Sequence, residues 1–70
     1  MTYTLFIHNN YDEELGVCYS DEFQDTDKSF VDEFNTDEEL SELLMEYFPD
    51  NYDSPADAME EANDLLYWMN

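Results

Sequence analysis

The sequence predicts an α+β fold, with a small antiparallel sheet in the N-terminal half packed against two amphipathic helices in the C-terminal half. Three observations predict this class: strand-type alternation near the N-terminus, helical spacing of apolar residues after residue 36, and two helix-capping sequences. The pattern contains no internal repeat and no linker, so we expect one compact acidic domain spanning residues 1–70.

The N-terminal half contains two or three strand-like stretches. In TYTLFIH, residues 2–8, a strand would place Tyr3, Leu5 and Ile7 on one face and the intervening residues on the other. GVCYS, residues 16–20, follows the turn-forming stretch NNYDEELG and predicts a hairpin with a long loop. KSFVDEF, residues 28–34, fits a strand or a helix, because Phe30 and Phe34 also have helical spacing, and we favour a third strand.

Two capped helices are expected in the C-terminal half. Thr36 and Glu39 form a capping-box pattern, and the following apolar residues keep helical spacing until Pro49 ends the helix. Ser54 then caps a second helix, and Pro55 takes its first position. The apolar stripe of the second helix consists of Ala58, Ala62, Leu65, Leu66 and Met69.

The charge balance is extreme for a folded domain. The 70 residues contain 20 Asp and Glu against one Lys, for a formal net charge of -19. Nine of the carboxylates surround Lys28 in SDEFQDTDKSFVDEFNTDEEL, residues 20–40. Such a charge opposes compaction by self-repulsion. The hydrophobic share of 43% and the aromatic share of 17% nevertheless indicate a folded chain rather than a disordered one.

Charges of a single sign also line both expected helices. Glu38, Glu42 and Glu46 follow at i+4 steps opposite the apolar stripe of the first helix. Each like-charge pair at this spacing destabilises a helix by roughly 0.2–0.5 kcal/mol. The corresponding acidic positions of the second helix are Asp57, Glu60, Glu61 and Asp64. A solvated face accounts for the polarity of these positions but not for their single sign, so we expect a role in binding.

Catalysis, metal binding and cofactor binding are not expected. A chain of this length is short for a large active-site cleft, and it has no arginine and one glycine with which to bind phosphate. Asp25 and Asp27 begin like a calcium loop, but Lys28 and the missing glycine break that pattern. Cys18 stands alone, which excludes an intrachain disulfide, and we expect a buried thiol. His8 has no partner for a metal site.

The expected partner is basic. DNA, RNA and anionic membranes would be repelled, whereas a basic nucleic-acid-binding protein would be attracted, with fast and salt-sensitive association. The N-terminal stretch MTYTLFIHNN lacks the features of a signal peptide or a membrane span, so we expect a cytoplasmic protein. A compact 70-residue domain is roughly 28 Å across. Duplex DNA of that length carries about 16 negative charges, close to the charge of this chain.

The stretches DEFQDTDKSFVDEF and NTDEELSELLMEYF, together with length and charge, resemble the small acidic DNA-mimic proteins that phages encode. This class includes anti-restriction proteins, inhibitors of uracil-DNA glycosylase and anti-CRISPR proteins, whose members share a surface property rather than a fold. The chain lacks the Glu-Ser-Ile strand segment of the glycosylase inhibitors. The resemblance implies occupation of the PAM-reading or strand-binding surface of a CRISPR effector complex in a bacterial host cell.

The predicted partner-binding residues are Asp21, Glu22, Asp25, Asp27, Asp32, Glu33, Asp37, Glu38, Glu39, Glu42, Glu46, Asp57, Glu60, Glu61, Asp64 and Trp68. Trp68 and Tyr67 are expected to lie partly in the core, with a partner-facing anchor as the alternative for Trp68. Three other functions stay open: an inhibitor of a restriction or DNA-repair enzyme, an acidic interaction module that does not mimic DNA, and adaptation to high salt.

Overall fold

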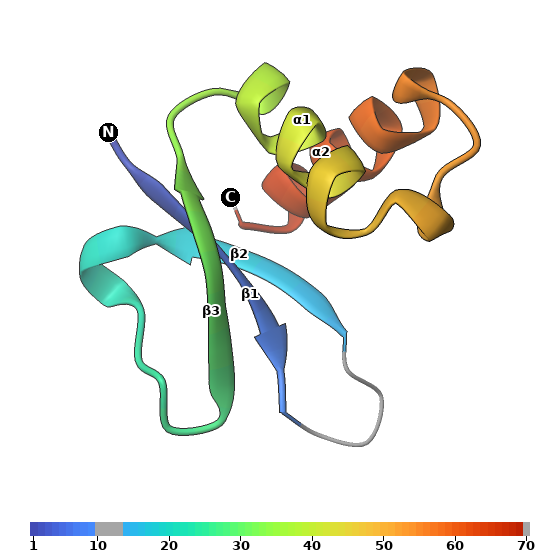
Figure 1. The fold of residues 1–70 in the computed structure, drawn as a ribbon. Coiled ribbons are helices and arrows are strands. Elements are labelled where there is room, and N and C mark those ends of the chain that lie inside the picture. The colour runs from blue at the N-terminus through green and yellow to red at the C-terminus, as the bar shows by residue number, and fades with distance from the viewer. Residues whose placement is uncertain (10–13, 70) are drawn as a thin grey trace. The chain divides into compact units, whose positions relative to one another are not determined.

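The computed structural model describes residues 1–9 and 14–69 (Figure 1). The chain divides into two compact units, Met1–Phe34 and Asn35–Asn70, and each is described by itself. Three strands form the first unit, and two α-helices form the second. The α+β class predicted from the sequence is therefore confirmed, with three strands rather than a single hairpin. The expected single domain stays a prediction.

The first unit is a three-stranded antiparallel sheet. Its strands are β1 (Tyr3–His8), β2 (Leu15–Tyr19) and β3 (Lys28–Phe34), with β1 between the other two (Figure 1). The pairing of β1 with β2 confirms the predicted hairpin, although residues 10–13 of its expected turn lie outside the described residues. The ambiguous stretch 28–34 is a strand, and its register with β1 shifts between Leu5 and Phe6, which marks a bulge.

One face of the sheet is apolar and aromatic, as the alternation in β1 predicts. Leu5 pairs with Val17 and is fully buried. The ring of Tyr3 lies 5.4 Å from that of Tyr19 on β2 and 5.4 Å from that of Phe34 on β3. Cross-strand aromatic contacts of this kind hold the register of neighbouring strands. They join all three strands through the central one.

The opposite face is built around the ring of Phe6, which is also buried. His8 meets this ring edge-on at 5.0 Å, and Phe23 lies 5.9 Å away between centroids. The ammonium of Lys28 lies 5.3 Å from the ring centroid, within the range of a cation–π contact. Gly16 pairs with Phe6 on β2, and a Cβ atom at Gly16 would lie 2.6 Å from Phe6 Cζ. The only glycine of the chain is therefore required by the close approach of this ring.

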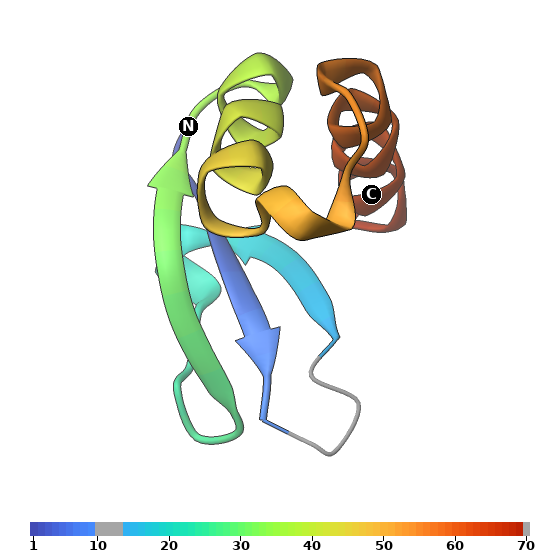
Figure 2. The same cartoon turned by 45° about the vertical axis from the view of Figure 1, so that its right-hand side comes forward.

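The second unit is a pair of helices, α1 (Asp37–Tyr47) and α2 (Pro55–Met69), which lie side by side (Figure 2). Their first turns bear out both predicted caps. The Thr36 hydroxyl accepts a hydrogen bond from the Glu39 N–H at 3.2 Å, and the Ser54 hydroxyl accepts one from the Asp57 N–H at 3.4 Å. Helix α1 ends before Pro49, which begins the short 3-10 helix η2 (Pro49–Asn51).

The buried positions of the helix pair follow the predicted apolar stripes. The fully buried residues are Leu40 and Leu44 on α1 and Ala58 and Ala62 on α2. Large side chains on one helix and small ones on the other allow close packing without voids. None of the helices in the described residues is both long and apolar enough to cross a membrane.

The contact of Gly16 with Phe6 leads to a test of the sheet. Gly16→Ala is expected to destabilise the protein by about 1–3 kcal/mol, because the new methyl group overlaps the Phe6 ring and forces a shift. Thermal denaturation followed by circular dichroism measures this loss. In a Phe6→Leu background the ring is gone, so the same substitution should cost much less. An equal cost in both backgrounds would contradict the packing described here.

Candidate partner-binding surface

The predicted acidic residues of the first unit lie along one continuous segment of chain. Asp21 and Glu22 lie in the 3-10 helix η1 (Ser20–Glu22), and the remaining four lie before and on β3. Backbone bonding holds part of this segment, because the Asn9 N–H donates to the Asp27 carbonyl at 2.8 Å. All of these carboxylates are exposed except Asp32, which is half-buried.

The acidic residues of α1 divide into two groups. Asp37, Glu38 and Glu39 lie in the first turn, where the positive end of the helix dipole stabilises negative charge. The Asp37 carboxylate also accepts a hydrogen bond from the Glu38 N–H at 2.8 Å. Glu42 and Glu46 are exposed farther along α1, where no such benefit exists, and the last turn contains no basic residue. Because Glu42 and Glu46 are like charges four residues apart, we expect this second group to lower the stability of α1.

Helix α2 repeats this division. Asp57 lies in the first turn, whereas Glu60 and Asp64 are exposed in the middle of the helix. Glu61 is half-buried and acts on Tyr52. Burial raises the pKa of the Tyr52 phenol, and the negative charge of Glu61 raises this pKa further. The charge of Glu61 therefore acts on the connection between the helices, whereas Glu60 and Asp64 are exposed.

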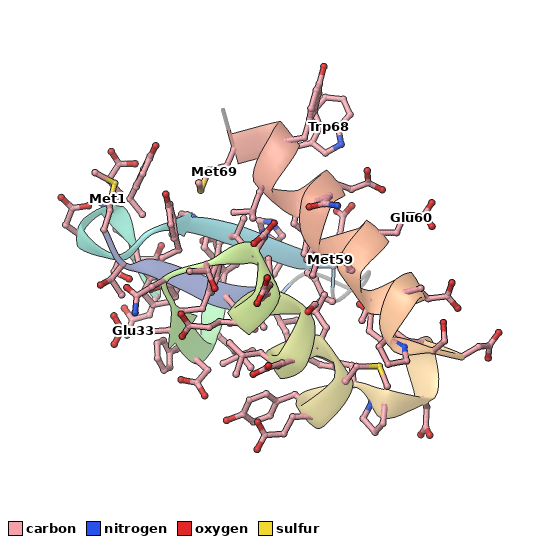
Figure 3. All side chains as sticks on the ribbon, turned by 90° about the horizontal axis from the view of Figure 1, so that it is seen from above. Met1, Glu33, Met59, Glu60, Trp68 and Met69 are labelled. Carbon is pink, nitrogen blue, oxygen red and sulfur yellow. The ribbon has the colours of Figure 1, made fainter. Side chains whose placement is uncertain are left out.

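Trp68 departs from the expectation that it is partly buried. Its side chain is 84% exposed, and that of the neighbouring Tyr67 is 70% exposed. The two rings meet edge to face, with centroids 5.7 Å apart. Figure 3 shows Trp68 projecting from α2 into open space. The core interpretation is wrong for Trp68 and for Tyr67, because helical spacing places both beside the acidic residues and away from the buried Ala58 and Ala62. Trp68 therefore has the exposure that a partner-facing anchor requires.

Cys18 is half-buried, so the prediction of a buried thiol is only partly right. Burial raises the pKa of the Cys18 thiol, the charge of Lys28 lowers it, and the charges of Glu22 and Asp21 raise it. The net shift is upward, which keeps the thiol protonated near neutral pH. Thiolate is the nucleophilic form of cysteine, so this environment does not activate Cys18.

No group of three His, Cys, Asp or Glu side chains among residues 1–9 and 14–69 is arranged to hold a metal ion. An open hollow of about 440 Å³ in the first unit is lined by Met1, Thr2, Tyr19, Ser20, Asp21 and Glu22. Both of the carboxylates in this lining, Asp21 and Glu22, belong to the predicted surface.

No protein-family model matches the chain, and neither a curated protein nor a solved structure is significantly similar to it. The candidate surface therefore rests on its own chemistry. Sequence reasoning missed the placement of Lys28 over Phe6 and the influence of Glu61 on Tyr52. Both depend on which segments meet in the fold. The helical spacing of Trp68 and Asp64, by contrast, is a signal that the sequence already contains.

The influence of Glu61 on Tyr52 can be measured by titration. Glu61→Gln removes the negative charge and should lower the raised pKa of Tyr52 toward its ordinary value. The pKa is followed by the NMR signal of ring-labelled tyrosine, assigned with Tyr52→Phe. Glu60→Gln removes the same charge from an exposed neighbouring position and serves as the control. Equal shifts in the two variants would contradict the influence assigned to Glu61.

Salt should stabilise a protein with this surface. Raising NaCl from 0.01 M to 0.5 M shortens the screening length from about 30 Å to about 4 Å and weakens repulsion between carboxylates. Relief of about 1–2 kcal/mol would raise the melting temperature by roughly 5–10 °C.

A matched variant separates this effect from a general effect of salt. Combining Glu42→Gln, Glu46→Gln, Glu60→Gln and Asp64→Asn should raise the melting temperature at low salt and reduce its dependence on NaCl, because four exposed charges are removed. A melting temperature that is the same at both salt concentrations in the native sequence would show that the acidic surface is not under repulsive strain.

Proposed function

We propose that this protein is a DNA-mimic inhibitor, which occupies the basic DNA-binding surface of a bacterial defence complex. The proposed target is the PAM-reading or strand-binding surface of a CRISPR effector complex, so the protein acts as an anti-CRISPR protein in the cytoplasm of the host cell. The observation that carries this proposal is the exposure of Glu42, Glu46, Glu60 and Asp64 at positions where negative charge destabilises the helices. A binding role accounts for charges that folding does not favour.

The spacing of these charges supports mimicry of a phosphate backbone. Carboxylates four residues apart on a helix are separated by about 6 Å along its axis. Along one strand of duplex DNA, every second phosphate is separated by about 6.8 Å of axis. A cleft that accepts phosphates through basic side chains can therefore meet a helix of this kind with a similar row of charges.

The binding energetics favour such a competitor. Phosphate contacts supply much of the affinity of a DNA-binding surface without reading the base sequence. A capped helix presents its carboxylates without the entropy cost of ordering a flexible acidic tail. The charge also steers the protein toward a basic surface at a high association rate. The proposal assigns no catalytic role to any residue.

The test is a competition assay between this protein and labelled target DNA on a CRISPR effector complex. The native protein should displace the DNA, and the displacement should weaken as salt is added. Combining Glu42→Lys with Glu46→Lys should reduce inhibition by at least about tenfold, because two adjacent contacts become repulsive. Circular dichroism should show unchanged helical content.

The matched control changes the net charge by the same amount at other positions of the second unit. Asp50→Lys with Asp53→Lys reverses two exposed carboxylates in the connection between α1 and α2, outside the predicted surface. This control should reduce inhibition much less than the α1 variant does. Equal losses would mean that net charge alone matters. Displacement from a restriction or DNA-repair enzyme, but not from a CRISPR effector, would reassign the target.

A further inference from the structure

The exposed pair formed by Tyr67 and Trp68 has no role in the core of the helix pair. Both rings are largely in water, although Trp68 is the only tryptophan of the chain. Aromatic side chains carry a large apolar area, whose burial is favourable, and they are enriched where proteins bind partners. The edge-to-face contact at 5.7 Å orders the two rings relative to each other. A partner therefore meets a defined aromatic surface.

The aromatic pair belongs to the same face of α2 as its carboxylates. At 100° per residue, the acidic side chains of α2 and its two last aromatic side chains fall within an arc of about 120°. This acidic-aromatic face consists of the exposed Asp57, Glu60, Asp64, Tyr67 and Trp68 and the half-buried Glu61. Figure 3 shows Glu60 and Trp68 both projecting from α2 away from α1. The buried Ala58 and Ala62 lie outside this arc, so the face is separate from the contact with α1.

The C-terminal end of this face favours a cation. The last turn of α2 contains no basic residue, although the negative end of the helix dipole is stabilised by positive charge. Asp64 precedes Tyr67 by three residues and Trp68 by four, so the Cβ atoms of such pairs lie about 5–6 Å apart. The Asp64 carboxylate and the rings of Tyr67 and Trp68 thus lie close together at the C-terminal end of α2. Helix α2 contains no basic residue of its own that could occupy this end.

We propose that Asp64, Tyr67 and Trp68 form a binding site for an arginine side chain of the basic partner. The inference rests on the proposed function, because it assumes that a basic surface docks on the acidic one. The guanidinium stacks on the ring of Trp68 while its N–H groups pair with the Asp64 carboxylate. Lysine fits less well, because its compact ammonium is strongly hydrated and lacks the planar fork of donors. The site gives the charged surface a preference among basic partners.

The test compares labelled peptides of eight arginines and of eight lysines, which carry the same charge. Fluorescence anisotropy gives the dissociation constant of each peptide, and the ratio of lysine to arginine values measures the preference. In Trp68→Leu this ratio should fall about two- to fivefold, because the cation–π contact is lost while every charge is kept. Phe30→Leu removes a 52% exposed aromatic residue from β3 and should leave the ratio unchanged. Circular dichroism checks that both variants fold.

Two outcomes overturn the site: an unchanged ratio in Trp68→Leu, or an equal fall in Phe30→Leu. Quenching of Trp68 fluorescence by the arginine peptide, greater than by the lysine peptide, supports it. The proposed function is tested separately, by the DNA competition assay. If the ratio depends on Trp68 but the protein does not displace DNA, the arginine site stands and DNA mimicry is wrong. If DNA is displaced and the ratio does not depend on Trp68, only the arginine site is lost.

Discussion

Mutual repulsion among 20 carboxylates, opposed by one lysine, is the constraint under which this chain folds. Contacts between neighbouring residues oppose this repulsion within each unit. Fully buried leucine and alanine side chains join α1 and α2, and aromatic contacts join the three strands. Acidic residues occupy the first turns of both helices, where the helix dipole stabilises them. Lys28 packs on Phe6 within the sheet, so the only lysine of the chain contributes to the packing of the first unit.

This distribution separates charges that help the fold from charges that do not. Asp37 and Asp57 lie where a helix favours negative charge, and Glu61 is linked to the connection between the helices. Glu42 and Asp64 lie on exposed helix faces among charges of the same sign. The loss of folding free energy at such positions is divided among several like-charge pairs, and it stays small enough for a folded domain. A basic partner would convert the same repulsion into attraction, which is the physical basis of the proposed mimicry.

Much of the fold could be predicted because its signals are local. Thr36 caps the start of α1, and Pro49 follows its end. Ser54 caps the start of α2, and Pro55 is its first residue. The central position of β1, the bulge beside Phe6 and the role of Gly16 could not be predicted, because they depend on contacts between strands distant in sequence. The prediction that Trp68 is partly buried was wrong, because its position on the helix beside Asp64 decides its exposure and its apolar character does not. The acidic surface itself followed from composition and spacing, since charged side chains are rarely buried.

If this protein is a DNA mimic as proposed, it and DNA compete for one surface of the target. Native mass spectrometry of the target complex with both ligands in excess detects this competition, because it counts the species that coexist. We expect two binary complexes, one with DNA and one with this protein, in proportions that follow the ligand ratio. A stable ternary complex of target, DNA and this protein, with DNA affinity unaltered, would contradict this expectation.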